Sequence, residues 1–325
     1  MTGRHRNLFL AAALLTYLLV TLGGVVCVTD SSRGCPDWPA CYGRLLPPLR
    51  LNSILEYTHR VVAALTSLFI VASAVVAWQR YRAIRWLSRP LAIAIVFLLA
   101  VVVFGALVVL RGLEPALAAL DLGSALLVQA LVVTAAAVAF ARHRNPALPD
   151  RLSFDSTLAR LALWALVAVW IVLVSGVLVA ASGSAVRCLS WPLYGAAQHL
   201  AVNPAREWLH GARRLAGGLA GILVVAVAVQ AWRVQHGQRA IRRTATVMGV
   251  LFVAEIVVGG LLVVGGSALL LEVVYVSLAA ALWALLAALL VLAGLPSPAP
   301  ASEHEPETLE PGGQGFQGPR TFYSQ

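Results

Sequence analysis

The sequence contains no lysine and little charge of any kind. All 24 of its positive side chains are arginine, and only 12% of its 325 residues are charged. So little charge excludes an ordinary water-soluble domain. The chain also lacks a phosphate-cradling glycine-rich loop, an HExxH metalloprotease motif and a Ser/His/Asp set, which excludes the common nucleotide-binding and hydrolytic classes.

Apolar residues dominate instead. They make up 60% of the chain, and the mean hydropathy is +0.85. Eight apolar runs are long enough to cross the hydrocarbon core of a bilayer at about 1.5 Å per residue. They lie at 8–28, 52–78, 91–110, 117–141, 161–182, 207–232, 246–266 and 269–294. The sequence therefore predicts an all-α integral membrane protein with eight transmembrane helices.

The arginines are concentrated at every second helix boundary. They precede the first run and fill the connections near residues 80–89, 142–160 and 233–243. By the positive-inside rule, these connections and both termini are expected in the cytoplasm, with 29–50 and 183–206 on the outer side of the inner (plasma) membrane. The same distribution argues against nucleic acid as a partner, despite the net charge of +10. The acidic segment 295–325 is expected to be a disordered cytoplasmic tail.

Two of the four cysteines, Cys35 and Cys41, fall in the first outward loop, where an oxidising compartment would allow a disulfide. Two free thiols are the alternative. Cys188 lies in the other outward loop without a nearby partner in the sequence. Cys27, inside the first apolar run, is expected to be a buried apolar residue.

An internal repeat relates the two halves of the chain. Unusual residues recur at offsets of 151 to 154 positions: Gly24 and Gly176, Cys35 and Cys188, Trp38-Pro39 and Trp191-Pro192, Glu56 and Glu207, His59 and His210, Gly105 and Gly259. Four helices per unit is an even number, so the two units keep the same orientation, as parallel repeats. The predicted division is two four-helix bundles, 1–145 and 146–294, followed by the tail.

Each half places E-x-x-H at the start of its second helix, as Glu56/His59 and Glu207/His210. This spacing puts both side chains on one helical face, so a carboxylate and an imidazole can address one ligand inside a bundle. Inward-pointing histidines in a membrane bundle are typical of haem axial ligation. Arginines near these histidines could pair with haem propionates: Arg60, Arg213 and Arg214. A histidine near a helix end that merely lies at the membrane interface is the alternative.

The outward GCPDWPACYG loop (34–43), the E-x-x-H-R start of the second helix and the two four-helix halves together resemble the haem A synthase family of cytochrome oxidase assembly, over about 8–294. The resemblance implies that a methyl group of haem O is oxidised to the formyl group of haem A, with one half binding haem O and the other a haem B that relays electrons. It matches Glu56 to a required glutamate, His59 to a substrate-side ligand, and Cys35 and Cys41 to a disulfide. A quinol-like membrane donor, haem O synthase and respiratory oxidase subunits are the implied partners.

The family pattern has a second histidine in each half, but this chain has Asp121 and Tyr275 at those places, again 154 residues apart. Three outcomes are open: a five-coordinate iron with an open face, ligation or hydrogen bonding by Tyr275 with Asp121 as a proton carrier or water anchor, or no haem at all. Two rival functions follow from these departures. One is a haem-binding electron-transfer subunit, and the other is a haem-free assembly partner of a respiratory complex.

Overall fold

All regular structure in the described part of the chain is helical. The computed structural model describes residues 1–179, 204–234, 238–265 and 268–296. One short 3-10 helix, η1 (Ser31–Arg33), lies in the connection after the first helix. The long helices are α1 (Gly3–Val28), α2 (Leu51–Tyr81), α3 (Arg85–Leu110), α4 (Pro115–Arg144), α5 (Thr157–Val179), α6 (Pro204–Val234), α7 (Arg239–Gly265) and α8 (Leu269–Gly294).

Each of these eight helices is long and apolar enough to span a membrane, which confirms the predicted fold class. The chain is a multi-pass membrane protein. Several helices begin earlier than their apolar runs: α3 starts at Arg85 rather than at residue 91, and α7 at Arg239 rather than at residue 246. Helical hydrogen bonding continues beyond the hydrocarbon core, where arginine can reach water, so an apolar run underestimates the length of its helix.

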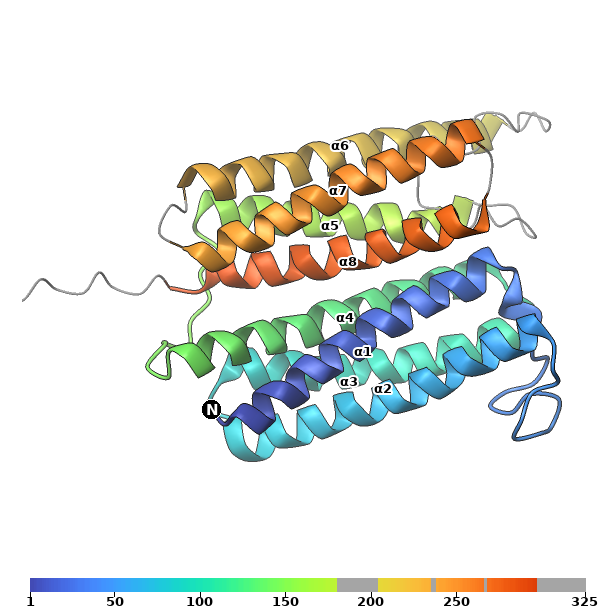
Figure 1. Cartoon of the computed structure of the whole chain (residues 1–325), viewed down its shortest axis with the longest axis horizontal. Helices are drawn as coiled ribbons and strands as arrows, with labels where there is room; N and C mark the ends of the chain where they lie inside the picture. The colour runs from blue at the N-terminus through green and yellow to red at the C-terminus, as the bar shows by residue number, and fades with distance from the viewer. Residues whose placement is uncertain (180–203, 235–237, 266–267, 297–325) are drawn as a thin grey trace, which may run out of the picture.

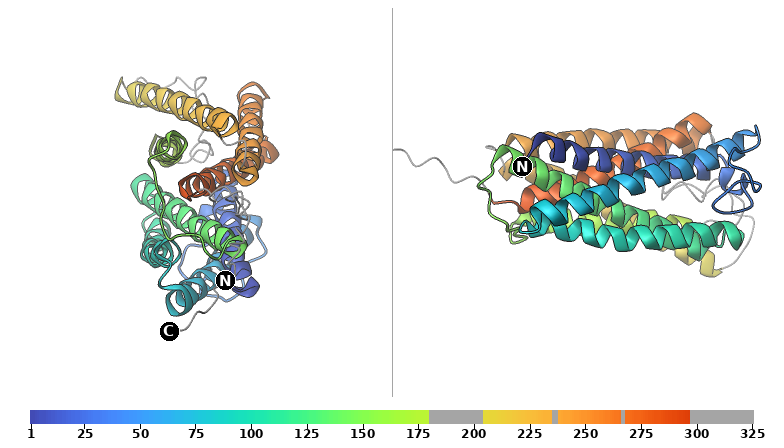
Figure 2. Two further views of the ribbon diagram at one scale, coloured as in Figure 1. Left: turned by 90° about the vertical axis from the view of Figure 1, so that its left-hand side faces the viewer. Right: turned by 90° about the horizontal axis from the view of Figure 1, so that it is seen from below.

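The helices form two neighbouring groups. Figure 1 shows α1–α4 in one layer of the molecule and α5–α8 in the other, and the end view in Figure 2 shows the same separation. Buried apolar side chains fill the interior of each group, with Phe9, Ile70 and Leu91 in the first and Val224, Met248 and Leu286 in the second.

The two groups meet where α1 and α4 pack against α8, and α4 against α5. Trp283 of α8 donates from Nε1 to the Leu126 carbonyl of α4 at 2.9 Å, and Trp170 of α5 donates to the Gly123 carbonyl at 3.2 Å. A Cβ atom at Gly24 of α1 would lie only 2.9 Å from Val276 of α8. The absence of a side chain at Gly24 is therefore what permits α1 and α8 to approach closely.

The connection 29–50 joins α1 to α2 at one end of the bundle, which we call the loop end. At this end α1 and α3 finish and α2 and α4 begin (Figure 1). At the opposite end, Asp150 caps α3 by accepting from the Arg85 N–H at 2.7 Å, and Arg142 approaches the same carboxylate at 3.7 Å. The candidate site lies at the loop end.

Candidate haem site at the loop end of the bundle

The first turns of α2 carry the polar residues that the sequence singles out. Glu56 is only 4% exposed, and both of its carboxylate oxygens accept hydrogen bonds. Oε2 accepts from the backbone N–H of Cys35 at 2.8 Å, and Oε1 pairs with the guanidinium of Arg60 one turn later. Glu56 thus joins α2 to the loop above it.

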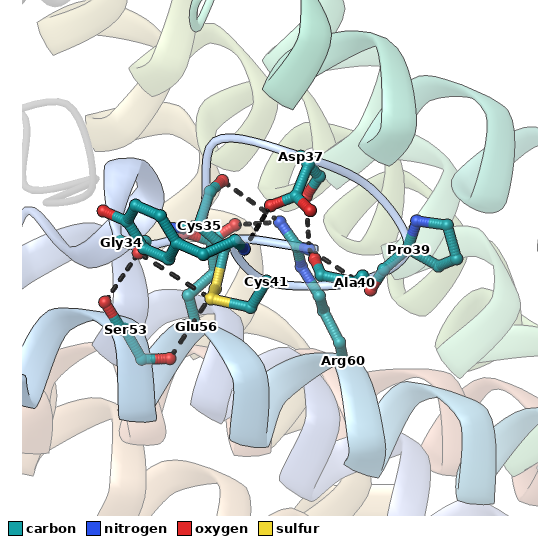
Figure 3. A network of polar contacts seen from close by, with 10 residues as sticks. Gly34, Cys35, Asp37, Pro39, Ala40, Cys41, Ser53, Glu56 and Arg60 are labelled. Carbon is teal, nitrogen blue, oxygen red and sulfur yellow. Dashed lines mark hydrogen bonds and ion pairs between the residues drawn. A yellow bond between two sulfur atoms is a disulfide. The ribbon is translucent and has the colours of Figure 1, made fainter. Parts of the chain in front are cut away.

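The guanidinium of Arg60 is enclosed by the loop (Figure 3). Nη1 donates to the carbonyl of Asp37 at 2.6 Å and to the carbonyl of Ala40, and Nη2 approaches the Cys35 carbonyl at 3.4 Å. The sequence suggested that Arg60 pairs with a haem propionate. In the structure its partners are loop carbonyls and Glu56, so Arg60 holds residues 35–40 against α2.

The loop is further fixed by its own cross-links. Cys35 and Cys41 form the predicted disulfide, with Cα atoms 4.8 Å apart. Asp37 accepts from the N–H groups of Gly43 at 2.6 Å and Tyr42 at 2.5 Å, and these bonds, that of Gly43 foremost, lower the pKa of the Asp37 carboxyl. Beneath them, the Gly34 carbonyl accepts from the Ser53 hydroxyl at 2.6 Å.

The prediction for Cys27 was wrong. It is half-buried and disulfide-bonded rather than an apolar filler. Its place inside an apolar run concealed this role, because a bonded cysteine and a packed one look alike in sequence. Cys188 lies outside the described residues.

His59 follows Glu56 by three residues, but its ring faces α1. A Cβ atom at Gly23 would lie 3.2 Å from Cε1 of the imidazole, so glycine at this position makes room for the ring. The Nδ1 atom of His59 is buried without a hydrogen-bond partner among the described residues. A buried ring nitrogen without a partner is costly unless a ligand completes its environment.

Asp121 lies on α4 at about the same depth in the bundle as His59 on α2. Its Oδ1 atom is also buried without a hydrogen-bond partner in the described part of the chain, and it lies 3.6 Å from the position of a Cβ at Gly105 of α3. Measured along their own helices, Gly23, His59, Gly105 and Asp121 all lie about 8 to 12 Å from the loop end. Each helix of the first bundle therefore contributes one residue to a single layer, which holds two glycines and two polar side chains.

The second half is described less fully. His210 lies in helix α6, but its side chain is outside the described residues. Tyr275 of α8 is 2% exposed and interacts electrostatically with Arg213 of α6 and Glu255 of α7. Arg214 is half-buried on α6. The sequence did not connect Glu255 with Tyr275, because the sequence pattern alone does not fix how α7 is rotated against α8.

The donor set of this layer is compatible with a haem but not with a bare metal ion. The described residues contain no group of three or more His, Cys, Asp or Glu side chains that could hold an ion directly. Haem needs only one or two protein ligands because its macrocycle supplies the others, and imidazole is a common axial ligand. The His59 imidazole, whose Nδ1 atom has no hydrogen-bond partner among the described residues, can supply one such ligand. From its sequence context alone Gly23 would be interpreted as a helix-packing residue, and only the structure places it against the His59 ring.

Comparisons with known proteins identify the family of the chain. The family model described as cytochrome oxidase assembly protein (COX15-CtaA) matches residues 6–289. The chain is similar to the "heme A synthase" of Lysinibacillus sphaericus, with 27% identity over 89% of this chain and 95% of the relative. It is also similar to those of Bacillus licheniformis, with 27% identity over 70% and 76% of the two chains, and Halalkalibacterium halodurans, with 26% identity over 83% and 92%. The chain belongs to the COX15-CtaA family of cytochrome oxidase assembly proteins.

Proposed function

We propose that the protein is a haem A synthase, a membrane oxidoreductase that converts a methyl group of haem O to the formyl group of haem A. The single observation that supports this most is the His59 imidazole, which packs on Gly23 with its Nδ1 atom buried and without a hydrogen-bond partner in the described part of the chain. Haem O would lie in the α1–α4 bundle with its iron on His59. When bound, the haem supplies the iron chemistry that activates dioxygen.

The protein residues around His59 have positioning and proton-handling roles in this proposal. Asp121 lies at the same depth as His59, and its free carboxylate oxygen is suited to hold a water molecule or a proton near the reacting methyl group. Glu56 and Arg60 tie the disulfide loop to the helix turn that carries His59. A fixed loop at this end of the bundle excludes water from the site, and the proposed role of Glu56 is to stabilise charge at the edge of the substrate.

The second bundle would hold a haem B that relays electrons to the first. His210 is the proposed iron ligand, with Tyr275 as a second ligand or hydrogen-bond donor and Arg214 as a partner for a propionate. Each of the two oxidations inserts one oxygen atom from dioxygen into a C–H bond, releases the other oxygen atom as water, and consumes two electrons and two protons. The resulting geminal diol loses water to leave the formyl group. A quinol-like donor in the inner membrane would supply the electrons and the protons. Haem O synthase and respiratory oxidase subunits are the expected neighbours in the pathway, and both termini would face the cytoplasm.

The decisive assay is pigment analysis of cells that make haem O and express this chain. Hydroxylated and formyl haem should appear with the wild type and disappear with His59→Ala. His143→Gln is the matched control, since His143 lies at the other end of α4, where its Nδ1 contacts the Met1 carbonyl at 3.2 Å. A well-expressed wild type that yields neither product excludes the synthase.

A second candidate function is a haem-binding electron-transfer subunit without oxygenase chemistry. Asp121 favours it, because the resemblance to haem A synthases leads one to expect a histidine at this place. This candidate predicts a purified protein with the spectrum of haem B that does not change in Glu56→Ala, and no conversion of haem O in the pigment assay.

A further inference from the structure

The loop end carries a second feature, separate from the haem layer. A pocket of about 340 Å³ opens beside the start of α2, lined in part by Arg33, Tyr42, Arg50, Asn52 and Ser53. No acidic side chain is among the described residues that line it. Neither Arg33 nor Arg50 makes a side-chain hydrogen bond or ion pair with another described residue. The pocket therefore offers two available guanidinium groups and several neutral donors, a combination that suits a phosphate group.

Three leucines that lie close in sequence to the lining residue Arg50 are not covered by the described residues. Leu45, Leu46 and Leu49 are 87%, 78% and 96% exposed. Their segment is nevertheless anchored, because the Tyr57 hydroxyl of α2 donates to the Leu45 carbonyl and the Arg50 N–H donates to the Pro48 carbonyl at 2.7 Å. Large aliphatic side chains held outward in this way mark a surface that meets another apolar body.

The neighbouring surface indicates that this apolar partner is lipid. The leucines continue directly into the exposed apolar face of α2, formed by Leu51, Ile54, Val61, Leu65 and Leu68. This face belongs to a membrane-spanning helix and so meets lipid. In Figure 1 the connection 29–50 lies beside α2, on the side away from α5–α8. Acyl chains that contact α2 can therefore extend to the leucines, while their headgroup reaches the arginines.

We propose that Arg33, Arg50 and the exposed leucines of 45–49 form a phospholipid-binding site. The phosphate of an anionic lipid in the leaflet at the loop end binds in the arginine-lined pocket, and its acyl chains cover the leucines. Because the pocket includes Gly34 and Ser53, whose carbonyl and hydroxyl are bonded to each other, the bound lipid braces the loop beside Cys35. This inference does not depend on the proposed synthase activity, since it involves neither haem nor dioxygen.

Native mass spectrometry of the purified full-length protein in detergent tests the site by titration with dioleoyl phosphatidylglycerol. A guanidinium that donates charge-assisted hydrogen bonds to a bound phosphate contributes roughly tenfold in affinity. The double variant Arg33→Gln/Arg50→Gln should therefore bind about 100-fold more weakly. Arg44→Gln is the matched control: Arg44 is exposed in the same loop but does not line the pocket, so it should lose no more than the roughly fivefold effect of a surface charge. Equal losses in the control and the double variant would overturn the site.

Two further measurements identify the ligand as a lipid rather than free phosphate. The wild type should bind phosphatidylglycerol more tightly than diacylglycerol with the same chains, a comparison that needs no variant. Leu45→Ser/Leu46→Ser should weaken phosphatidylglycerol binding and leave binding of inorganic phosphate unchanged. Equal affinity for the two lipids contradicts a phosphate site. Leucine variants that bind lipid normally but no longer co-purify with oxidase subunits overturn the proposal in favour of a protein partner.

Discussion

The carboxylate of Glu56 offers a quantitative test of how the loop is held. Both of its oxygens act as acceptors, one from the Cys35 N–H at 2.8 Å and one from Arg60. Glu56→Gln has nearly the same shape but replaces one acceptor by an NH2 group. Whichever way the amide turns, a donor then faces either the Cys35 N–H or the guanidinium. A hydrogen bond to a charged group contributes about 1.5–3 kcal/mol, so local opening of the loop should become easier by about 2 kcal/mol.

This change is measurable through the disulfide, because Cys35 and Cys41 are 1% and 0% exposed and a reductant must wait for the loop to open. About 2 kcal/mol corresponds to roughly 30-fold faster reduction when opening and closing are fast. The assay is limiting dithiothreitol, rapid alkylation and peptide mapping of the two cysteines. Thr58→Val, at an exposed position on the same helix, is the control. A rate for Glu56→Gln within twofold of the wild type, or an equal acceleration by Thr58→Val, refutes the reasoning.

Three other variants test the remaining parts of the site. Gly23→Val should greatly reduce the haem bound per protein, because its Cβ would lie 3.2 Å from the His59 ring. Gly105→Ala should bind haem normally, since its Cβ would lie 3.6 Å from Asp121, which is an ordinary contact. Equal haem content in the two variants contradicts this packing. Asp121→His should convert a high-spin haem spectrum to a low-spin one by adding a second imidazole at the depth of His59, and an unchanged electron paramagnetic resonance spectrum counts against this. The pKa of Asp37 is lowered in the folded loop, so its contribution to loop stability is present above about pH 4 and is lost as the pH falls through the folded pKa. Reduction of the Cys35–Cys41 disulfide by a phosphine should accelerate in the wild type as the pH falls through the folded pKa of Asp37. In Asp37→Asn the disulfide should be reduced fast at every pH. A wild type whose reduction rate shows no such acceleration contradicts this role of Asp37.

The helices could be predicted from the sequence because hydropathy over about 20 residues is a sufficient signal in a bilayer. The first apolar run, at 8–28, and the last, at 269–294, correspond to α1 (Gly3–Val28) and α8 (Leu269–Gly294). Their ends could not be predicted equally well, since charged turns outside the hydrocarbon core remain helical. The Cys35–Cys41 disulfide could be predicted because both cysteines lie in one outward loop and the family resemblance implies the bond; free thiols were the alternative, and the structure shows the bond.

The role of Arg60 could not be predicted in the same way. Its sequence position beside His59 suggests a cofactor partner. In the structure, however, the loop folds back over α2 and brings the carbonyl groups of Asp37 and Ala40 to the Arg60 guanidinium. No periodicity reports where an irregular loop folds back, because its backbone groups find partners only in the tertiary structure. The contact of Gly23 with His59 was hidden for a related reason: it depends on the rotation of α1 against α2, which hydropathy does not fix.

The proposed activity requires that His59 hold the iron of a haem inside the α1–α4 bundle. The most direct measurement is the absorption spectrum of the purified protein, oxidised and reduced, with pyridine haemochrome quantitation, for the wild type and His59→Ala. We expect a Soret band in the wild type and a haem content lower by one per chain in His59→Ala. A wild type without a Soret band, or a variant with undiminished haem, would contradict iron ligation by His59.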